Sequence, residues 1–105
     1  MCDNVFQQIT ELKDNWNNNG ANAFSETLIA KCKRLVSEFQ IPPSIFPTAD
    51  NSIQMEWDNV AGDYLEINVY DDKCIVFQRL HNGVFSEYEA SEHELKNIVK
   101  IFFET

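Results

Sequence analysis

The feature that most constrains the fold is an alternation of apolar and polar residues in the second half of the chain. Residues 52–57 read SIQMEW and residues 63–70 read DYLEINVY. Successive side chains of a β-strand point to opposite faces of the sheet, so a period of two is typical of strands with one buried face. The two segments predict neighbouring strands that turn apolar side chains inward and leave acidic side chains facing water.

Two further strands are expected after this pair. Residues 74–80 read CIVFQRL, and the nearly continuous apolar start predicts an interior strand whose inward face the pattern does not identify. The dipeptide Asn82-Gly83 that follows is a strong hairpin signal, because both residues tolerate positive φ. Residues 84–89 are therefore expected to form the fourth strand.

Helical periodicity occurs on both sides of the strands. Apolar residues at spacings of three and four predict a first helix over residues 4–15 and a second helix that begins after the cap residue Ser25. The run NNNG at residues 17–20 is expected to end the first helix, because Asn side chains compete for backbone hydrogen bonds. Ser91 and Glu94 have the spacing of a capping box, which predicts a closing helix of about twelve residues.

A stiff connection joins the helical and strand-rich halves. Residues 41–47 read IPPSIFP and contain all three prolines of the chain, which enforce an extended backbone. The predicted order is ααββββα, an α+β fold in which a four-stranded antiparallel meander has helices packed on one face. The chain has 105 residues, of which 44% are hydrophobic, and it contains no Gly/Ser-rich linker. These properties predict a single domain over residues 1–105.

The cysteines and glycines argue against a metal or a cofactor. The three cysteines are widely spaced and form no close pair of zinc-ligand spacing, so we expect free thiols, with Cys32 and Cys74 in the core. The three glycines are isolated, and none belongs to a phosphate-binding loop. A signal-peptide pattern and a membrane-spanning apolar run are both missing from the sequence, which predicts a cytoplasmic protein.

Negative charge is concentrated in the strand-rich half. Residues 51–105 contain 11 Asp or Glu and 4 Lys or Arg, a net charge of −7, whereas residues 1–50 contain 6 and 4, a net charge of −2. An acidic sheet face repels the phosphates of nucleic acids and membranes and attracts basic proteins. We therefore predict a basic protein partner, without direct nucleic-acid or membrane binding, at a surface that comprises Glu56, Tyr64, Glu66, Tyr70, Glu87 and Glu89.

Two of these carboxylates could also carry chemistry. The apolar faces of the first two strands are in register if Met55 pairs with Ile67. Glu56 then stands opposite Glu66, and carboxylates this close could act as an acid/base pair or bind a cation. A hydrated pair on a solvated sheet is the simpler interpretation, because catalytic pairs need a cleft and further polar groups. One alternative function is accordingly a small hydrolase or metal-dependent enzyme that uses this pair, with His81 as a further candidate.

Two other groups of residues carry weaker signals. A nucleophilic triad can be drawn from Cys74, His81 and Asp72, but an apolar strand disfavours a cysteine thiolate, so we predict no catalytic residue. The only basic cluster of the sequence is expected to be a solvated helix face and comprises Lys31, Lys33 and Arg34.

Several short motifs resemble a group of small uncharacterised bacterial and phage proteins. The motifs are WNNNGA at residues 16–21, Ser25, PP at residues 42–43, FPT at residues 46–48, IQMEW at residues 53–57 and LEI at residues 65–67. In that group a Trp-(Asp/Asn)-x-x-Gly turn follows the first helix, a Pro-rich crossover ends in Pro-Thr, and an Ile-Gln-x-Glu-Trp strand precedes a Leu-Glu-Ile strand. The resemblance covers about residues 12–70. It implies no established activity, but it implies a mobile-element context, where small acidic proteins often occupy the basic surface of another protein.

The charge pattern and the resemblance together favour an interaction protein. We expect a non-enzymatic acidic protein, inhibitor-like or antitoxin-like, that binds a basic protein surface. A homodimeric structural or accessory subunit is the remaining alternative. It would pair through a sheet edge or through leftover apolar surface at Ile101 and Phe103.

Overall fold

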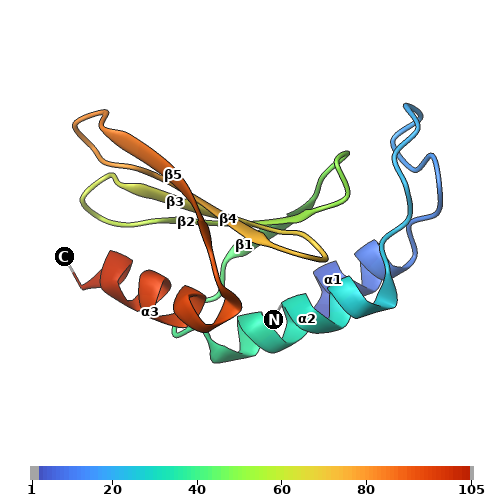
Figure 1. Ribbon diagram of the computed structural model, residues 1–105, viewed down its shortest axis with the longest axis horizontal. Helices are drawn as coiled ribbons and strands as arrows, with labels where there is room; N and C mark the ends of the chain where they lie inside the picture. The colour runs from blue at the N-terminus through green and yellow to red at the C-terminus, as the bar shows by residue number, and fades with distance from the viewer. Residues whose placement is uncertain (1–2, 105) are drawn as a thin grey trace.

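The structure is built around a five-stranded antiparallel meander. The computed structural model describes residues 3–104. Its strands are β1 (Ser44–Pro47), β2 (Ile53–Asp58), β3 (Tyr64–Val69), β4 (Cys74–Arg79) and β5 (Phe85–Ala90). They lie in the sheet in chain order, with β1 at one edge and β5 at the other (Figure 1). The predicted antiparallel meander is confirmed.

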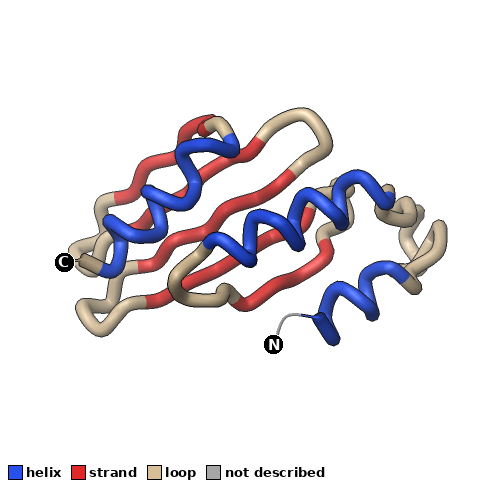
Figure 2. Tube along the Cα trace, turned by 90° about the horizontal axis from the view of Figure 1, so that it is seen from below, coloured by secondary structure: helices blue, strands red, loops and turns tan. Residues whose placement is uncertain are grey.

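Three helices pack on one face of this sheet. They are α1 (Asp3–Thr10), α2 (Glu26–Glu38) and α3 (Glu92–Phe103). All three lie on the same side of the strands, and α2 lies between α1 and α3 (Figures 1 and 2). The predicted α+β class, with helices on one face of the sheet, is therefore confirmed.

Both predicted helix caps are present. The backbone N–H of Leu28 donates to the Ser25 hydroxyl at 3.1 Å, and α2 begins at the next residue after Ser25. The backbone N–H of Ser91 donates to Oε1 of Glu94 at 2.9 Å at the start of α3. These bonds satisfy backbone donors that the first turn of a helix leaves without partners.

The first strand corrects the prediction of a four-stranded sheet. Within the Pro-rich segment that the sequence presents as a crossover, Ile45 pairs with Met55 of β2. Ile45 is buried, whereas Phe46 is 46% exposed on the opposite face. Proline at the end of β1 is tolerated because an edge strand needs ladder bonds on one side only. The observed order is ααβββββα.

The first helix is shorter than predicted. α1 ends at Thr10, although the apolar spacing predicts a helix that continues to residue 15. Trp16 still packs against the core, but it does so from a loop in which Asn15 and Asn18 have left-handed backbone, with φ of 65° and 59°. The Asn15 side chain accepts a bond from the Gly20 N–H at 2.8 Å. Such side-chain bonds replace the backbone bonds that a longer helix would make.

Three of the four hairpins use the same turn. A backbone N–H donates to the carbonyl three residues earlier, from Asn51 to Thr48 at 3.3 Å, Gly62 to Asn59 at 3.1 Å and Gly83 to Leu80 at 2.8 Å. The three donor residues have positive φ of 67°, 88° and 91°. The predicted hairpin at Asn82-Gly83 therefore forms, but of these two residues only Gly83 has positive φ.

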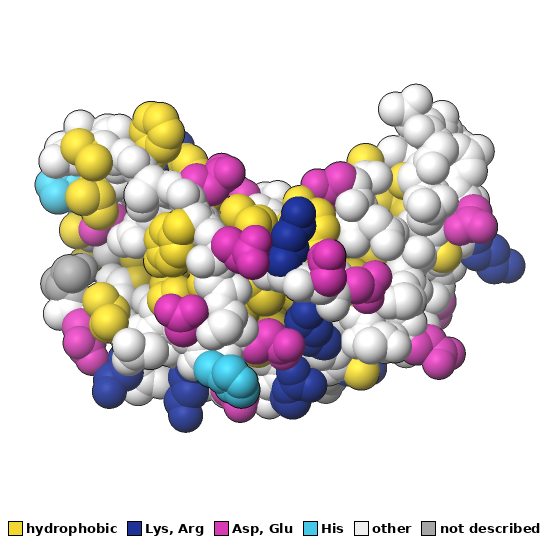
Figure 3. Space-filling view, viewed as in Figure 1, with side chains coloured by type: hydrophobic (Ala, Val, Ile, Leu, Met, Phe, Trp, Pro, Cys, Tyr) yellow, Lys and Arg dark blue, Asp and Glu magenta, His cyan; other side chains and the backbone are white. Residues whose placement is uncertain are grey.

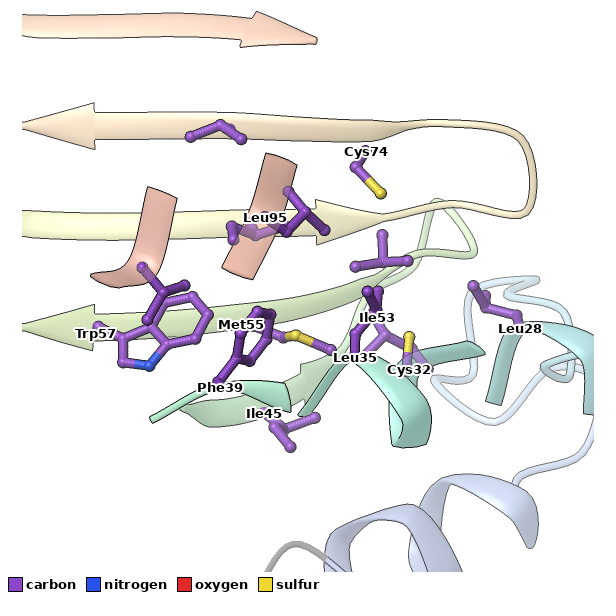
Figure 4. Packing of buried hydrophobic residues seen from close by; sticks show 14 of the residues in the cluster. Leu28, Cys32, Leu35, Phe39, Ile45, Ile53, Met55, Trp57, Cys74 and Leu95 are labelled. Carbon is purple, nitrogen blue, oxygen red and sulfur yellow. The ribbon is translucent and has the colours of Figure 1, made fainter. Parts of the chain in front are cut away.

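The core lies between the sheet and the helices. Its residues from the strands include Ile53, Met55, Trp57, Leu65, Ile67, Val69, Cys74 and Val76, and its residues from α2 and α3 include Leu28, Cys32, Leu35, Leu95, Val99 and Phe102 (Figure 4). The rings of Phe39 and Trp57 meet edge to face, with centroids 5.3 Å apart. The Trp57 indole also donates to the carbonyl of Ile41 at 2.8 Å, which ties the Pro-rich segment to β2.

The two core cysteines behave as predicted. Cys32 and Cys74 are buried free thiols. Burial is the main cause that raises the pKa of Cys32 to about 12, and it also raises the pKa of Cys74. Cys2 lies outside the described residues.

Candidate protein-binding face of the sheet

The sheet has a second face that points away from the three helices. We call it the outer face, and it comprises Ser44, Phe46, Gln54, Glu56, Asp58, Tyr64, Glu66, Asn68, Ile75, Phe77, Arg79, Phe85, Glu87 and Glu89. The residues between these along each strand point to the opposite face, on which the helices pack. None of the described helices covers the outer face (Figure 1). In profile the molecule is hollowed on this side, between the β4–β5 hairpin and the loop after α1 (Figure 3).

The strand register places two predicted site residues directly opposite each other. Met55 pairs with Ile67, and Glu56 pairs with Glu66, as predicted from the alternation. The same row continues across the sheet, because Glu66 pairs with Phe77 of β4, and Phe77 pairs with Glu87 of β5. Glu56, Glu66 and Glu87 therefore lie in one row with a single aromatic residue among them.

The paired carboxylates are held by neutral donors. The Tyr64 hydroxyl donates to Oε1 of Glu66 at 2.7 Å, and the Asn68 amide donates to Oε2 at 2.6 Å. The Gln54 amide donates to Oε2 of Glu56. Within residues 3–104, no ion pair joins either glutamate to a Lys, Arg or His. The pair is thus oriented by hydrogen bonds while its negative charge stays uncompensated.

The Tyr64 hydroxyl beside these carboxylates has a raised pKa. Tyr64 is partly buried, and this burial is the largest cause that raises its pKa. The hydrogen bond to Glu66 and the negative charges of Glu66 and Glu56 raise the pKa further, because they oppose a phenolate. Tyr64 consequently remains a hydrogen-bond donor at the edge of the acidic row.

Aromatic rings line one end of the outer face. The ring of Phe77 lies between those of Tyr64 and Phe85, at centroid distances of 6.2 and 6.0 Å. Phe85 is 68% exposed. The guanidinium carbon of Arg79 lies 5.3 Å from the centroid of Tyr64 and stacks on this ring. The face therefore combines carboxylates, exposed rings and one stacked cation.

The remaining predicted site residues occupy separate positions. Glu87 and Glu89 are exposed on the outer face of the edge strand β5. Tyr70 follows β3 at the other end of the strand from Tyr64, and its hydroxyl donates to Oδ2 of Asp50 at 2.7 Å. This bond is the largest cause that raises the pKa of Tyr70. Tyr70 thus ties β3 to the β1–β2 turn, away from the Glu56 and Glu66 pair.

Sequence reasoning missed the aromatic part of this face. Phe77, Arg79 and Phe85 were not identified, because the apolar start of β4 did not show which of its faces is inward. The short β3–β4 connection contains a usable signal. Val69 pairs with Cys74 across it, so the inward position of Val69 fixes Cys74 as inward and Phe77 as outward.

Lys31 differs from the prediction of a solvated basic cluster. Its side chain is only 12% exposed. Its ammonium donates to the carbonyl oxygens of Tyr70 and Asp71 at 2.8 and 3.3 Å, and lies 4.0 Å from Glu92. Lys31 therefore links α2 to the β3–β4 turn.

The other two cations of the cluster have different surroundings. Arg34 forms an ion pair with Glu92 of α3, whereas Lys33 is exposed, as predicted. A pocket of about 400 Å³ lies beside this junction and is lined by both positive and negative side chains, among them Lys73, Glu89 and His93. Mixed charge gives this pocket no preference for one kind of ion.

The strand geometry excludes a nucleophilic triad of Cys74, His81 and Asp72. Cys74 begins β4, and His81 lies beyond its other end. Six strand residues separate such positions by about 20 Å, too far for proton transfer. His81 instead contacts Asp63, with Nδ1 at 3.0 Å from Oδ1. Within the described residues, no group of three or more His, Cys, Asp or Glu side chains is placed to hold a metal ion.

Two further findings concern the class of protein. No helix in residues 3–104 has the length and apolar character needed to span a bilayer. No family model, curated protein or solved structure matches this chain, and the resemblance to small bacterial and phage proteins stays a prediction from its residues.

Proposed function

We propose that this protein is a non-enzymatic interaction protein that binds a basic protein surface through the outer face of its sheet. The observation that carries this proposal is the pair of Glu56 and Glu66, which stand opposite each other on a face that none of the described helices covers. Neither forms an ion pair with another residue of the described chain. An inhibitor-like or antitoxin-like role in the cytoplasm, in a bacterial or phage mobile-element context, is part of the same proposal.

The negative charge of the protein favours a positively charged partner. The chain has a net charge of −9, and Arg79 is the only Lys or Arg among the outer-face residues. A negative face steers a positive partner into encounter and disfavours phosphate-rich ligands. Exposed aromatic side chains are also typical of protein interfaces, because they bury a large area at low entropic cost.

The proposal is tested with a basic peptide of mixed Lys and Arg as the probe. Titration into the isotope-labelled protein should shift the amide signals of β2 to β5, and binding should weaken as salt is raised from about 50 to about 300 mM, since screening lengths fall to a few ångströms. Glu56→Gln/Glu66→Gln should weaken binding. Glu26→Gln/Glu38→Gln removes the same charge from exposed positions of α2 and serves as the control. Shifts confined to the helices, or equal losses in the two variants, would contradict the proposal.

The dimer alternative has two observations in its favour. β5 is an edge strand in which only Ala90 is buried, and Ile101 of α3 is 53% exposed. Edge pairing of two copies, however, brings together strands that carry Glu87 and Glu89, and like charges at an edge oppose such pairing. Light scattering coupled to size-exclusion chromatography distinguishes a monomeric interaction protein from a homodimeric subunit. A dimer that persists at every concentration would favour the homodimeric subunit.

A further inference from the structure

We infer that the outer face selects arginine over lysine, and that an arginine of the partner stacks on the rings of Phe77 and Phe85 between Glu66 and Glu87. This inference rests on the proposed function. The proposed function itself requires only that the partner be positively charged. The occupant we commit to is therefore a basic protein surface that presents arginine side chains.

The strand register creates the required arrangement. Glu66, Phe77 and Glu87 are consecutive members of one row on β3, β4 and β5. Neighbouring strands are about 4.8 Å apart, so the two carboxylate-bearing positions are about 10 Å apart, with an aromatic ring between them. A planar cation placed over that ring would have a carboxylate on each side.

The rings offer a surface for stacking. Phe77 and Phe85 have centroids 6.0 Å apart and planes inclined by 32°. Phe85 is the more exposed of the two, at 68%. A guanidinium is planar and weakly hydrated, and it gains from an aromatic face and from carboxylates at the same time. An ammonium is compact and strongly hydrated, and it gains less from the ring.

The chain itself provides an example of this contact. Arg79 lies on the outer face, where it pairs with Tyr64 of β3 and Phe85 of β5, and its guanidinium carbon is 5.3 Å from the Tyr64 ring centroid. Among the ion pairs of residues 3–104, none joins Arg79 to a carboxylate. A guanidinium on this face is therefore held by an aromatic ring. Arg79 stacks on Tyr64 although it also stands opposite Phe85, and the arginine that we infer would stack on the adjoining rings of Phe77 and Phe85.

The test compares an eight-residue oligo-arginine peptide with an oligo-lysine peptide of equal length and charge. We expect the arginine peptide to bind about threefold to tenfold more tightly in calorimetry at low salt. Phe85→Leu should remove most of this preference, because it weakens oligo-arginine binding more than oligo-lysine binding. Phe46→Leu, an exposed aromatic position on the opposite edge of the same face, is the matched control and should keep the preference.

The outcomes distinguish failure of the inferred arginine preference from failure of the proposed function. Equal affinity for both peptides would overturn the inference and leave the proposed function standing, because both peptides still bind. An arginine preference that survives in Phe85→Leu would also overturn it, since the ring would then have no part in the selection. Failure of both peptides to bind at low salt would overturn the proposed function, and the inference with it.

Discussion

Glu56 and Glu66 face each other across β2 and β3, and each carboxylate accepts hydrogen bonds from neutral side chains. Like charges directly opposite on neighbouring strands destabilise an antiparallel pair. The repulsion between Glu56 and Glu66 therefore destabilises the sheet of the free protein. A basic partner would remove the repulsion on binding, so the same pair connects stability with the proposed function.

Glu56→Gln should stabilise the free protein. The substitution removes the repulsion and keeps an amide oxygen that can accept the bond from Gln54. We expect the free energy of unfolding to rise by about 0.5 kcal/mol at low ionic strength. The gain should shrink at high salt, because screening weakens the repulsion in the parent protein. Urea unfolding at two salt concentrations measures both effects.

The matched control for this prediction is Glu26→Gln, which makes the same charge change at an exposed position in the first turn of α2. A negative charge there favours the helix dipole, so its removal should lower stability slightly, whereas a general effect of net charge would raise it. A loss of stability in Glu56→Gln would show that this carboxylate stabilises the sheet, and it would remove the reason to assign the pair to binding.

The register of this pair was accessible from the sequence, and the reason is physical. Alternation over residues 52–57 and 63–70 allows only one pleat phase, because a slip of one residue would turn Met55 and Ile67 to water. The capping residues Ser25 and Ser91 were equally accessible, since a cap is a local interaction between residues three apart. Interactions between residues close in sequence, such as these, can be predicted without a structure.

Features that depend on tertiary context were not accessible in this way. β1 has four residues, too few for alternation to show, and the prolines before it and at its end are typical of a loop. Trp16 continues the apolar pattern of α1 from outside the helix, because loop residues can also fill the core. The start of β4 is apolar on both faces, since Cys74 and Val76 enter the core while Ile75 and Phe77 line the outer face. The aromatic part of the candidate site was lost for this last reason.

Asp63 should make stability depend on acid pH. This buried carboxylate accepts bonds from the backbone N–H of His81 at 2.7 Å and from the Asn59 amide at 3.2 Å, and it joins the β2–β3 turn to the β4–β5 hairpin. The bond from the His81 N–H is the largest cause that lowers the pKa of Asp63 below its usual value of 3.8. A lowered folded pKa contributes stability above pH 3.8, and this contribution is lost as the pH falls below that value.

Urea unfolding between about pH 6 and pH 2 measures this contribution. We expect Asp63→Asn to be less stable than the parent at pH 6 and to approach the parent as the pH falls. Asp58→Asn, at an exposed end of β2, should keep the parent's pH profile. A constant difference between Asp63→Asn and the parent over the whole range would contradict the assigned ionisation.

The two buried thiols should be unreactive in the native protein. Burial raises the pKa of Cys32 to about 12, and burial also raises the pKa of Cys74. The thiolate is the reactive form, so modification should need exposure of the core. In Cys2→Ser, Ellman's reagent at pH 8 should react only at the rate of unfolding, and two thiols should react at once in urea. Rapid labelling of either thiol without denaturant would show that its part of the core opens locally.

Lys31→Met should destabilise the junction between α2 and the β3–β4 turn. The ammonium of Lys31 donates to the carbonyl oxygens of Tyr70 and Asp71, and methionine keeps most of the apolar stem while it removes the donor. The Tyr70 carbonyl is partly buried, and a buried acceptor left without a partner costs about 1–3 kcal/mol, so we expect a loss within this range in urea unfolding. Lys33→Met, two residues away on the exposed side of the same helix, should cost less than about 0.5 kcal/mol. Equal effects of the two substitutions would mean that the loss comes from net charge, and they would contradict the role assigned to the bonds of Lys31 to the turn.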